Sequence, residues 1–139
     1  MEWFAFRAKE EVLGLDAQYV YRVVDDAKIT PVPLTPECLL GLTYYRGELY
    51  VVIDIVNILG YGKADPERNS PIILIKWSDK KLALVSDEIV GLLWIEDEVG
   101  DPPTYTKGDD VVRSISPENI WDTLLKLSHG PDEIPKNLH

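Results

Sequence analysis

Two apolar runs separated only by Arg46-Gly47-Glu48 constrain the fold of this chain more than any other feature of its sequence. Leu40 to Tyr45 and Leu49 to Ile55 are short runs of apolar residues, which is typical of β-strands. Gly47 supplies the permissive backbone that a tight connection requires. The pattern predicts a β-hairpin with Arg46 at its tip.

Short strand-like runs recur along the rest of the chain and predict a mainly β fold. In Glu2 to Ala8 the apolar residues alternate between two faces, which is the period of a strand. Turn signals about every 8–12 residues favour small barrels over a parallel sheet. Further strands or extended segments are expected at Val12 to Leu15, Lys28 to Val32, Ile72 to Trp77, Leu82 to Val85, Val90 to Ile95 and Val111 to Ile115.

Helices are expected only as short connections and at the C-terminus. Asp16 can cap a short helix over Ala17 to Val24, and Thr35-Pro36-Glu37-Cys38 predicts one helical turn. Ser116 opens a helix that extends to about Leu127, and the tail that follows is expected to be mobile. The apolar face of this last helix would consist of Ile120, Trp121, Leu124 and Leu127.

Charge and composition exclude several classes of partner. The chain of 139 residues carries 14 Lys and Arg against 24 Asp and Glu, a formal net charge of -10. This excess repels phosphate backbones and anionic membrane surfaces, so nucleic acid is not expected as a partner. No apolar run is long enough to insert into a membrane, and the N-terminus does not resemble a signal peptide. A soluble, cytoplasmic protein is expected.

No set of residues resembles a catalytic or metal centre, so no catalytic residue, metal or cofactor is expected. His129 and His139 both fall in the tail, and Cys38, the only cysteine, has apolar neighbours that favour a buried structural thiol. The acidic stretch Glu96 to Asp101 is typical of solvated surface. A hydrolase that uses this acidic loop is retained as a remote alternative to a binding protein.

Asp54 and Arg46 each leave two interpretations open. Asp54 interrupts an apolar run, so its carboxylate either caps the turn that follows or contacts a partner, and capping is favoured. Arg46 is either a solvated turn residue or a recognition residue. The second interpretation gains weight from Tyr44, Tyr45 and Tyr50, because interfaces favour tyrosine together with arginine.

The ordered series of these residues resembles the CheW-like domain of bacterial and archaeal chemotaxis. The signature of that family is Gly-Val-x-Asn-Leu-Arg-Gly-x-x-x-Pro-x-x-Asp-Leu, and residues 41–55 align with it from Gly41 through Arg46-Gly47 to Asp54-Ile55. Ile29 to Pro33 resembles the Ile-Thr-x-Val-Pro segment of the family, and Leu82 to Gly91 resembles its Val-Gly-Leu-Val-Asp-x-Val segment. The resemblance covers most of residues 3–95.

The resemblance implies two intertwined, five-stranded SH3-like barrels packed over an apolar seam, in a single domain over residues 1–127 with a tail at 128–139. It implies an adaptor that couples the cytoplasmic tips of chemoreceptors, the methyl-accepting chemotaxis proteins, to the regulatory domain of the histidine kinase CheA. Arg46 would lie by the groove between the barrels, where the receptor tip docks. The residues expected at partner contacts are Arg22, Tyr44, Tyr45, Arg46, Gly47, Glu48 and Val56, with structural roles for Gly41 and Asp54.

The chain departs from the family pattern at several positions. Tyr44-Tyr45 replaces Asn-Leu, Val51 replaces the proline, Val56 replaces a common arginine, and Arg22 stands where an acidic residue is frequent. The part after Ile95 looks shorter by about one hairpin, so the second barrel is expected to lack strands. The C-terminal helix or another chain would then cover an open edge. An alternative role is a divergent module for an atypical receptor and kinase, or for a system outside chemotaxis.

Overall fold

The computed structural model describes residues 2–64, 70–94, 104–107 and 110–129, which form ten strands and three short or moderate helices. The helical elements are the 3-10 helix η1 (Ala17–Tyr19), α1 (Ile55–Ile58) and α2 (Pro117–His129). The strands are β1 (Glu2–Ala8), β2 (Glu11–Asp16), β3 (Val20–Val24), β4 (Leu39–Tyr45), β5 (Glu48–Ile53), β6 (Ile72–Trp77), β7 (Lys80–Val85), β8 (Glu88–Trp94), β9 (Thr104–Lys107) and β10 (Asp110–Ile115).

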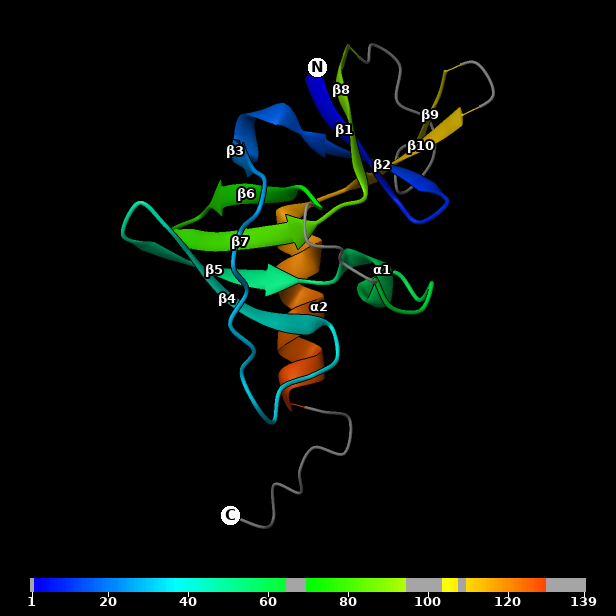
Figure 1. Ribbon diagram of the computed structural model, residues 1–139. Coiled ribbons are helices and arrows are strands. Elements are labelled where there is room, and N and C mark those ends of the chain that lie inside the picture. Colours follow the sequence, from blue (N-terminus) through cyan, green and yellow to red (C-terminus); the bar gives the residue numbers. More distant parts are fainter. Residues whose placement is uncertain (1, 65–69, 95–103, 108–109, 130–139) are drawn as a thin grey trace.

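The strands form two intertwined sheets of five strands each (Figure 1). The terminal sheet has the order β8-β1-β2-β10-β9, and the central sheet has the order β3-β6-β7-β5-β4. The chain begins in the terminal sheet, completes the central sheet, and then returns. Two pairs are parallel, β10 with β2 and β5 with β7, and the others are antiparallel. The expectation of two intertwined five-stranded units in a mainly β chain is confirmed.

Three apolar clusters explain how the sheets are held together. The alternation in β1 supplies two of them, because Trp3 and Ala5 face the interior of the terminal sheet while Phe6 and Ala8 face the seam between the sheets. The third cluster consists of side chains of β5, β6 and β7 in the central sheet and includes Tyr50 and Leu74. The seam cluster also contains Leu13, Leu15, Cys38, Ile53, Ile55, Val56, Ile73, Ile75, Leu82, Leu84, Ile120 and Leu124.

The two edge strands of the central sheet, β3 and β4, are linked by the chain segment that runs between them. The chain that leaves β3 crosses the face of this sheet opposite to α2 and reaches β4 (Figure 1). There Thr30 and Leu42 form an antiparallel bridge with N···O distances of 2.8 and 2.9 Å. Gly41 makes this approach possible, since its φ is +147° and a Cβ there would lie 2.2 Å from the Thr30 carbonyl oxygen. The bridge joins the segment that follows edge strand β3 to the opposite edge strand, β4.

The helix expected over Ala17 to Val24 is largely wrong. Asp16 does cap a helical turn, because its carboxylate accepts a hydrogen bond from Gln18 N at 3.1 Å, but η1 ends at Tyr19. The chain continues as β3, which pairs with β6. The run from Val20 is rich in β-branched residues, and a free edge of the central sheet was available to it. The turn at residues 35–38 likewise forms no helix.

The expectation that the second barrel lacks strands is also wrong. β9 pairs with β10 in antiparallel register, Val111 opposite Thr106, which completes the terminal sheet with five strands. The C-terminal helix therefore does not replace a missing strand at an edge. It begins after Ser116, whose Oγ accepts from Asn119 N at 3.1 Å, and it lies against one side of the central sheet (Figure 1). Ile120 and Leu124 enter the seam cluster.

Candidate functional site

Arg46 and Gly47 form the two-residue loop that joins β4 to β5. Tyr45 and Glu48 are the paired residues on either side of the loop, and both loop residues have positive φ angles, 51° for Arg46 and 81° for Gly47. A turn with two such residues matches the natural twist of the strands it connects. The turn therefore holds the exposed side chain of Arg46 at the tip of the hairpin.

The ring of Tyr45 lies beside two guanidinium groups. The central carbon of the Arg46 guanidinium is 5.4 Å from the ring centroid, and that of Arg22 on β3 is 5.7 Å away. Arg22 is also 5.8 Å from the ring of Tyr21, and the two tyrosine rings meet edge to face at 6.3 Å. Attraction between cations and ring faces orients both arginines. These contacts form a second link between the edge strands β3 and β4 of the central sheet.

Two lysines, Lys76 on β6 and Lys81 on β7, surround Glu48. Nζ of Lys76 is 2.8 Å from Oε1 of Glu48 and 4.0 Å from the Tyr21 ring centroid, and Nζ of Lys81 is 3.7 Å from Oε2. The hydrogen bond from Lys76 lowers the pKa of the Glu48 carboxyl, and the same bond raises the pKa of the Lys76 amino group. Glu48 therefore remains ionised and holds the lysine in place.

We refer to Arg22, Arg46, Lys76 and Lys81 as the cationic cluster. Together with Glu48 it carries four positive charges and one negative charge, a local balance of +3, whereas the whole chain has a net charge of -10. Among the residues that the structure describes, none forms an ion pair with Arg22 or Arg46. Their N–H groups are therefore available to acceptors on another molecule.

The structure brings most of the expected contact residues to this end of the central sheet, with one exception. Tyr45, Arg46 and Glu48 belong to the hairpin, and Tyr44 beside them is 74% exposed. Val56 does not belong there. It is 2% exposed and packs in the seam cluster from helix α1, so its expected role as a surface contact is wrong.

Sequence reasoning missed three members of the site. Tyr21, Lys76 and Lys81 come from β3, β6 and β7, and the pairing of these strands with each other and with β5 brings them to Arg22 and Glu48. Tyr21 carries no signal of its own when residues 17–24 are interpreted as a helix. The two lysines flank the turn between two apolar runs, where exposed charge is common and uninformative.

Asp54 has a structural role, as the capping interpretation expects. It is buried at the N-cap of α1, where its Oδ1 accepts from Asn57 N at 3.2 Å. Its Oδ2 accepts from Ala64 N at 2.8 Å, so the carboxylate also fixes the loop after α1. Two backbone donors compensate the burial of the charge. Asp54 therefore positions the end of β5 opposite to Arg46.

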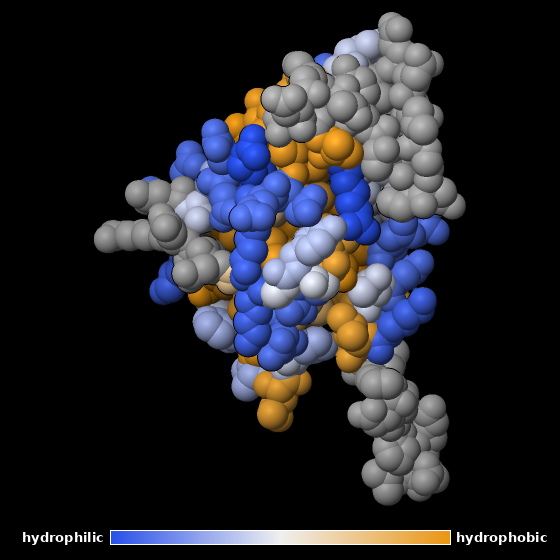
Figure 2. Space-filling model, turned by 90° about the vertical axis from the view of Figure 1, so that its right-hand side faces the viewer, coloured by the Kyte–Doolittle hydropathy of each residue, from blue (hydrophilic) through white to orange (hydrophobic). Residues whose placement is uncertain are grey.

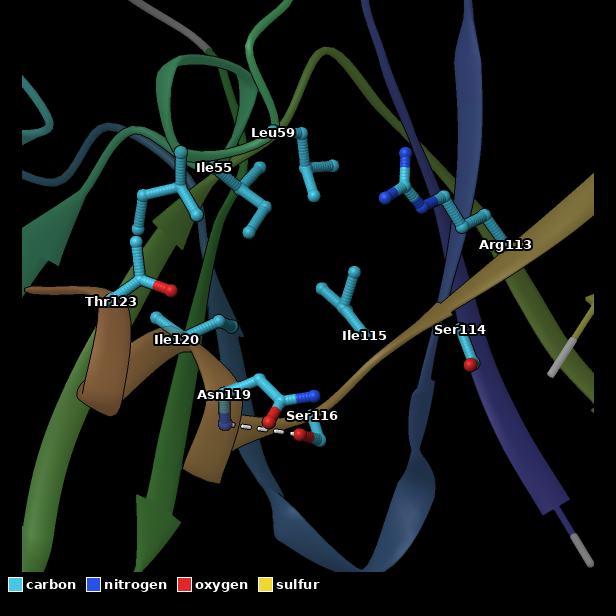
Figure 3. Close-up of a pocket in the computed structure, with 10 residues that line it drawn as sticks. Ile55, Leu59, Arg113, Ser114, Ile115, Ser116, Asn119, Ile120 and Thr123 are labelled. Carbon is cyan, nitrogen blue, oxygen red and sulfur yellow. Dashed lines mark hydrogen bonds between the residues drawn. The ribbon is translucent and has the colours of Figure 1, made fainter. Parts of the chain in front are cut away.

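A pocket of about 280 Å³ lies where α1, α2 and β10 meet at the seam (Figure 3). Arg46 is not among its lining residues. The hairpin tip precedes β5 and α1 follows it, so the six residues of β5 separate the two places by roughly 20 Å. The resemblance to the CheW-like domain implies that Arg46 lies by a groove between the barrels, and the seam pocket is a different place at the other end of β5.

The described residues contain no group of three or more side chains suited to hold a metal ion. Cys38 is buried, and desolvation raises the pKa of its thiol, which disfavours the nucleophilic thiolate. The acidic stretch at residues 96–101 and His139 lie outside the described residues. Within the part of the chain that the structure describes, no helix is long and apolar enough to cross a membrane.

Comparison with known proteins decides the family. A model of the CheW-like domain matches residues 2–122 of the chain, which includes both sheets and the first turns of α2. The chain belongs to the CheW-like domain family. The structure of the scaffolding protein TtCheW from Thermoanaerobacter tengcongensis is similar, with a TM-score of 0.74 and 28% sequence identity over 82% of this chain and 87% of that one.

Curated relatives support the same family. Protein FrzA of Myxococcus xanthus is 30% identical over 91 residues, which are 66% of this chain and 57% of FrzA. Chemotaxis protein CheW of Thermotoga maritima is 28% identical over 94 residues, 68% of this chain and 62% of that protein. The matched part thus spans about three fifths of the length of these relatives. The SH3-like, mainly β architecture of the CheW-like family agrees with the two five-stranded sheets.

Proposed function

We propose that this CheW-like protein is a non-catalytic adaptor of chemotaxis signalling in the cytoplasm. It couples the cytoplasmic tips of chemoreceptors to the regulatory domain of the histidine kinase CheA through protein–protein contacts. The observation that carries the proposal is the exposed hairpin of Arg46 in a chain that matches the CheW-like family over residues 2–122. Relatives and a solved structure named as CheW proteins and a scaffold support the same role.

The cationic cluster is the surface that we assign to the receptor tip. Tyr44, Tyr45 and Tyr21 offer aromatic contact area around it, and arginine with tyrosine is the composition of energetically dominant interface positions. Arg46 is held in the turn by its backbone and beside Tyr45 by its guanidinium, so little side-chain entropy is lost when a partner binds. Acceptors on the receptor would complete the hydrogen bonds of Arg22 and Arg46.

Replacing Arg46 with alanine is expected to weaken binding to the receptor tip by roughly 10- to 100-fold, as for a central arginine of an interface. The fold should persist, because the side chain is exposed and the turn residue keeps its neighbours. Arg46→Lys should also lose affinity, because an ammonium does not reproduce the planar fork. Isothermal titration of a receptor fragment into each variant measures the effect.

Arg7→Ala is the matched control for this experiment. Arg7 lies on β1 of the terminal sheet, and its 4.0 Å contact with Glu88 is a surface ion pair of small energetic value. The control should bind the receptor fragment like the parent protein. Equal binding by Arg46→Ala and the parent would remove the hairpin tip from the contact surface.

The resemblance to the CheW-like domain implies a frequent acidic residue at the position of Arg22, so this side chain is expected to influence the choice of partner. Arg22→Glu is expected to weaken binding to the cognate receptor and kinase and to strengthen binding to a CheW partner set from a relative with the acidic residue. Lys126→Glu on the exposed side of α2 makes the same change in net charge and should alter neither affinity much. If both affinities change in the same direction for Arg22→Glu, the charge at this position does not select the partner.

A further inference from the structure

The seam pocket has an apolar interior that three elements build. Ile55 comes from α1 and Leu59 caps its C-terminus, Ile115 comes from β10, and Ile120 and Thr123 come from α2. Figure 3 shows their side chains around one central space. Ile58 lines it as well. Several of these side chains are only half-buried, which leaves apolar surface in contact with solvent. Another apolar group that filled the space would remove this surface from water.

Among the described residues that line the pocket, Arg113 is the only one with a charged side chain. In Figure 3 it extends from β10 toward the space between Leu59 and Ile115. One of its terminal nitrogens donates a 2.7 Å hydrogen bond to the hydroxyl of Tyr61, and the guanidinium lies 6.0 Å from the Tyr61 ring. No ion pair to Arg113 occurs within the described ranges. A guanidinium has five N–H donors, so it can still bind a carboxylate at the pocket rim.

The surroundings favour protein as the occupant. The face of the molecule on which α1 lies shows apolar surface between hydrophilic residues (Figure 2). A volume of about 280 Å³ is slightly below the usual range of pockets for drug-sized ligands and cofactors, and it suits a single large side chain. The net charge of -10 opposes an extended polyanion, whereas one arginine suffices for one carboxylate.

We propose that the seam pocket binds an apolar side chain that lies next to a carboxylate on a partner protein. The apolar side chain enters between α1, β10 and α2, and the carboxylate pairs with Arg113 at the rim. The pocket and the cationic cluster lie at opposite ends of β5, so both can be occupied at once. The proposal requires no assumption about which proteins bind the cationic cluster.

Methyl NMR of the full chain with labelled isoleucine tests this proposal directly. Ile55, Ile58, Ile115 and Ile120 line the pocket, while Ile73 and Ile75 belong to the seam cluster, do not line the pocket, and report on the fold. The probe is acetyl-Glu-Leu-amide, and a ligand of this size should bind with a dissociation constant on the order of 1 mM. We expect the pocket methyl signals to shift and saturate while the two reporters stay in place.

Two matched changes isolate the charge and the apolar contact. Acetyl-Gln-Leu-amide and acetyl-Glu-Ala-amide should each bind roughly fivefold more weakly or worse, because each lacks one of the two proposed contacts. In Arg113→Gln the Glu and Gln peptides should bind equally, which is the signature of a direct contact between two groups. Arg113→Lys should restore part of the preference for the Glu peptide.

Several results would overturn the proposal. Absence of pocket shifts at about 20 mM peptide, well above the expected dissociation constant, would exclude the site. Equal binding of the Glu and Gln peptides to the parent would exclude the role of Arg113. Pocket shifts that depend on protein concentration alone would identify a second copy as the occupant. Pocket shifts on removal of residues 130–139 would identify the chain's own C-terminus instead.

Discussion

Replacing Gly41 with alanine is expected to destabilise the protein by about 3–5 kcal/mol, because the substitution opposes the close approach of the Thr30 backbone to β4. The φ of +147° is unfavourable for any residue with a Cβ, and the new atom would lie 2.2 Å from the Thr30 carbonyl oxygen. The obstacle is backbone, so no side chain can rotate away. Relief requires the loss of both hydrogen bonds between Thr30 and Leu42.

Urea unfolding followed by circular dichroism measures this effect, and Gly47→Ala is its control. Gly47 also has a positive φ, 81°, but a Cβ there would meet no atom within 4 Å. The control should therefore cost only the conformational penalty of about 1–2 kcal/mol. If the two substitutions have equal cost, the approach of Thr30 to Gly41 does not limit the stability of the protein.

Ending the chain after Ser116 is expected to leave a protein that unfolds or associates at micromolar concentration. Ile120 and Leu124 of α2 are 2% and 4% exposed, and they pack against the other residues of the seam cluster. Loss of two such side chains costs about 2–5 kcal/mol each, which is comparable to the total stability of most domains. The newly exposed apolar residues, rather than a free strand edge, would then drive association.

A chain that ends after His129 is the control for the truncation, because it retains α2 with all of its described contacts. Light scattering across a dilution series should give the same molar mass for this control as the full chain has. The chain that ends after Ser116 should be associated or unfolded. A protein that ends at Ser116 and remains folded and monomeric would show that α2 contributes little to the seam. Leu124→Ala, with an expected loss of about 2–5 kcal/mol, tests the same contact with one side chain.

Local patterns in the sequence were sufficient for the hairpins and their faces. The alternation of β1 predicts that Phe6 and Trp3 face opposite sides, and they do lie in different clusters. Arg46-Gly47 predicts a tight turn, and both residues have the positive φ that such a turn needs. These features depend on neighbours along the chain. The motif around Gly41 and Asp54 then led to the correct family.

Features that depend on distant partners could not be predicted in this way. The run from Val20 fits a helical face and a strand equally well, and the edge of β6 decided for a strand. β9 has only four residues, too few for a clear strand pattern in the sequence, but pairing with β10 stabilises it. Val56 lies just after Asp54 in the motif from which partner contacts were expected. Helix α1 instead directs its side chain into the seam cluster. Tertiary packing settled each case.

The candidate site was predicted only in part for the same reason. Arg46 and Tyr45 are adjacent in sequence, and their contact needs nothing beyond the turn. Tyr21, Lys76 and Lys81 are far from them along the chain, and the strand order of the central sheet brings them to the same end. The seam pocket joins three elements and has no sequence signature at all.

The central claim is that one molecule of this CheW-like protein connects a receptor tip to a kinase regulatory domain, with the cationic cluster as the receptor surface. Sedimentation velocity of the three purified components from the same organism tests it most directly. We expect a ternary complex with the parent protein, and a complex with the kinase domain alone when Arg46→Ala is used. Competition between the receptor fragment and the kinase domain for the protein, or binding of neither, would contradict the account.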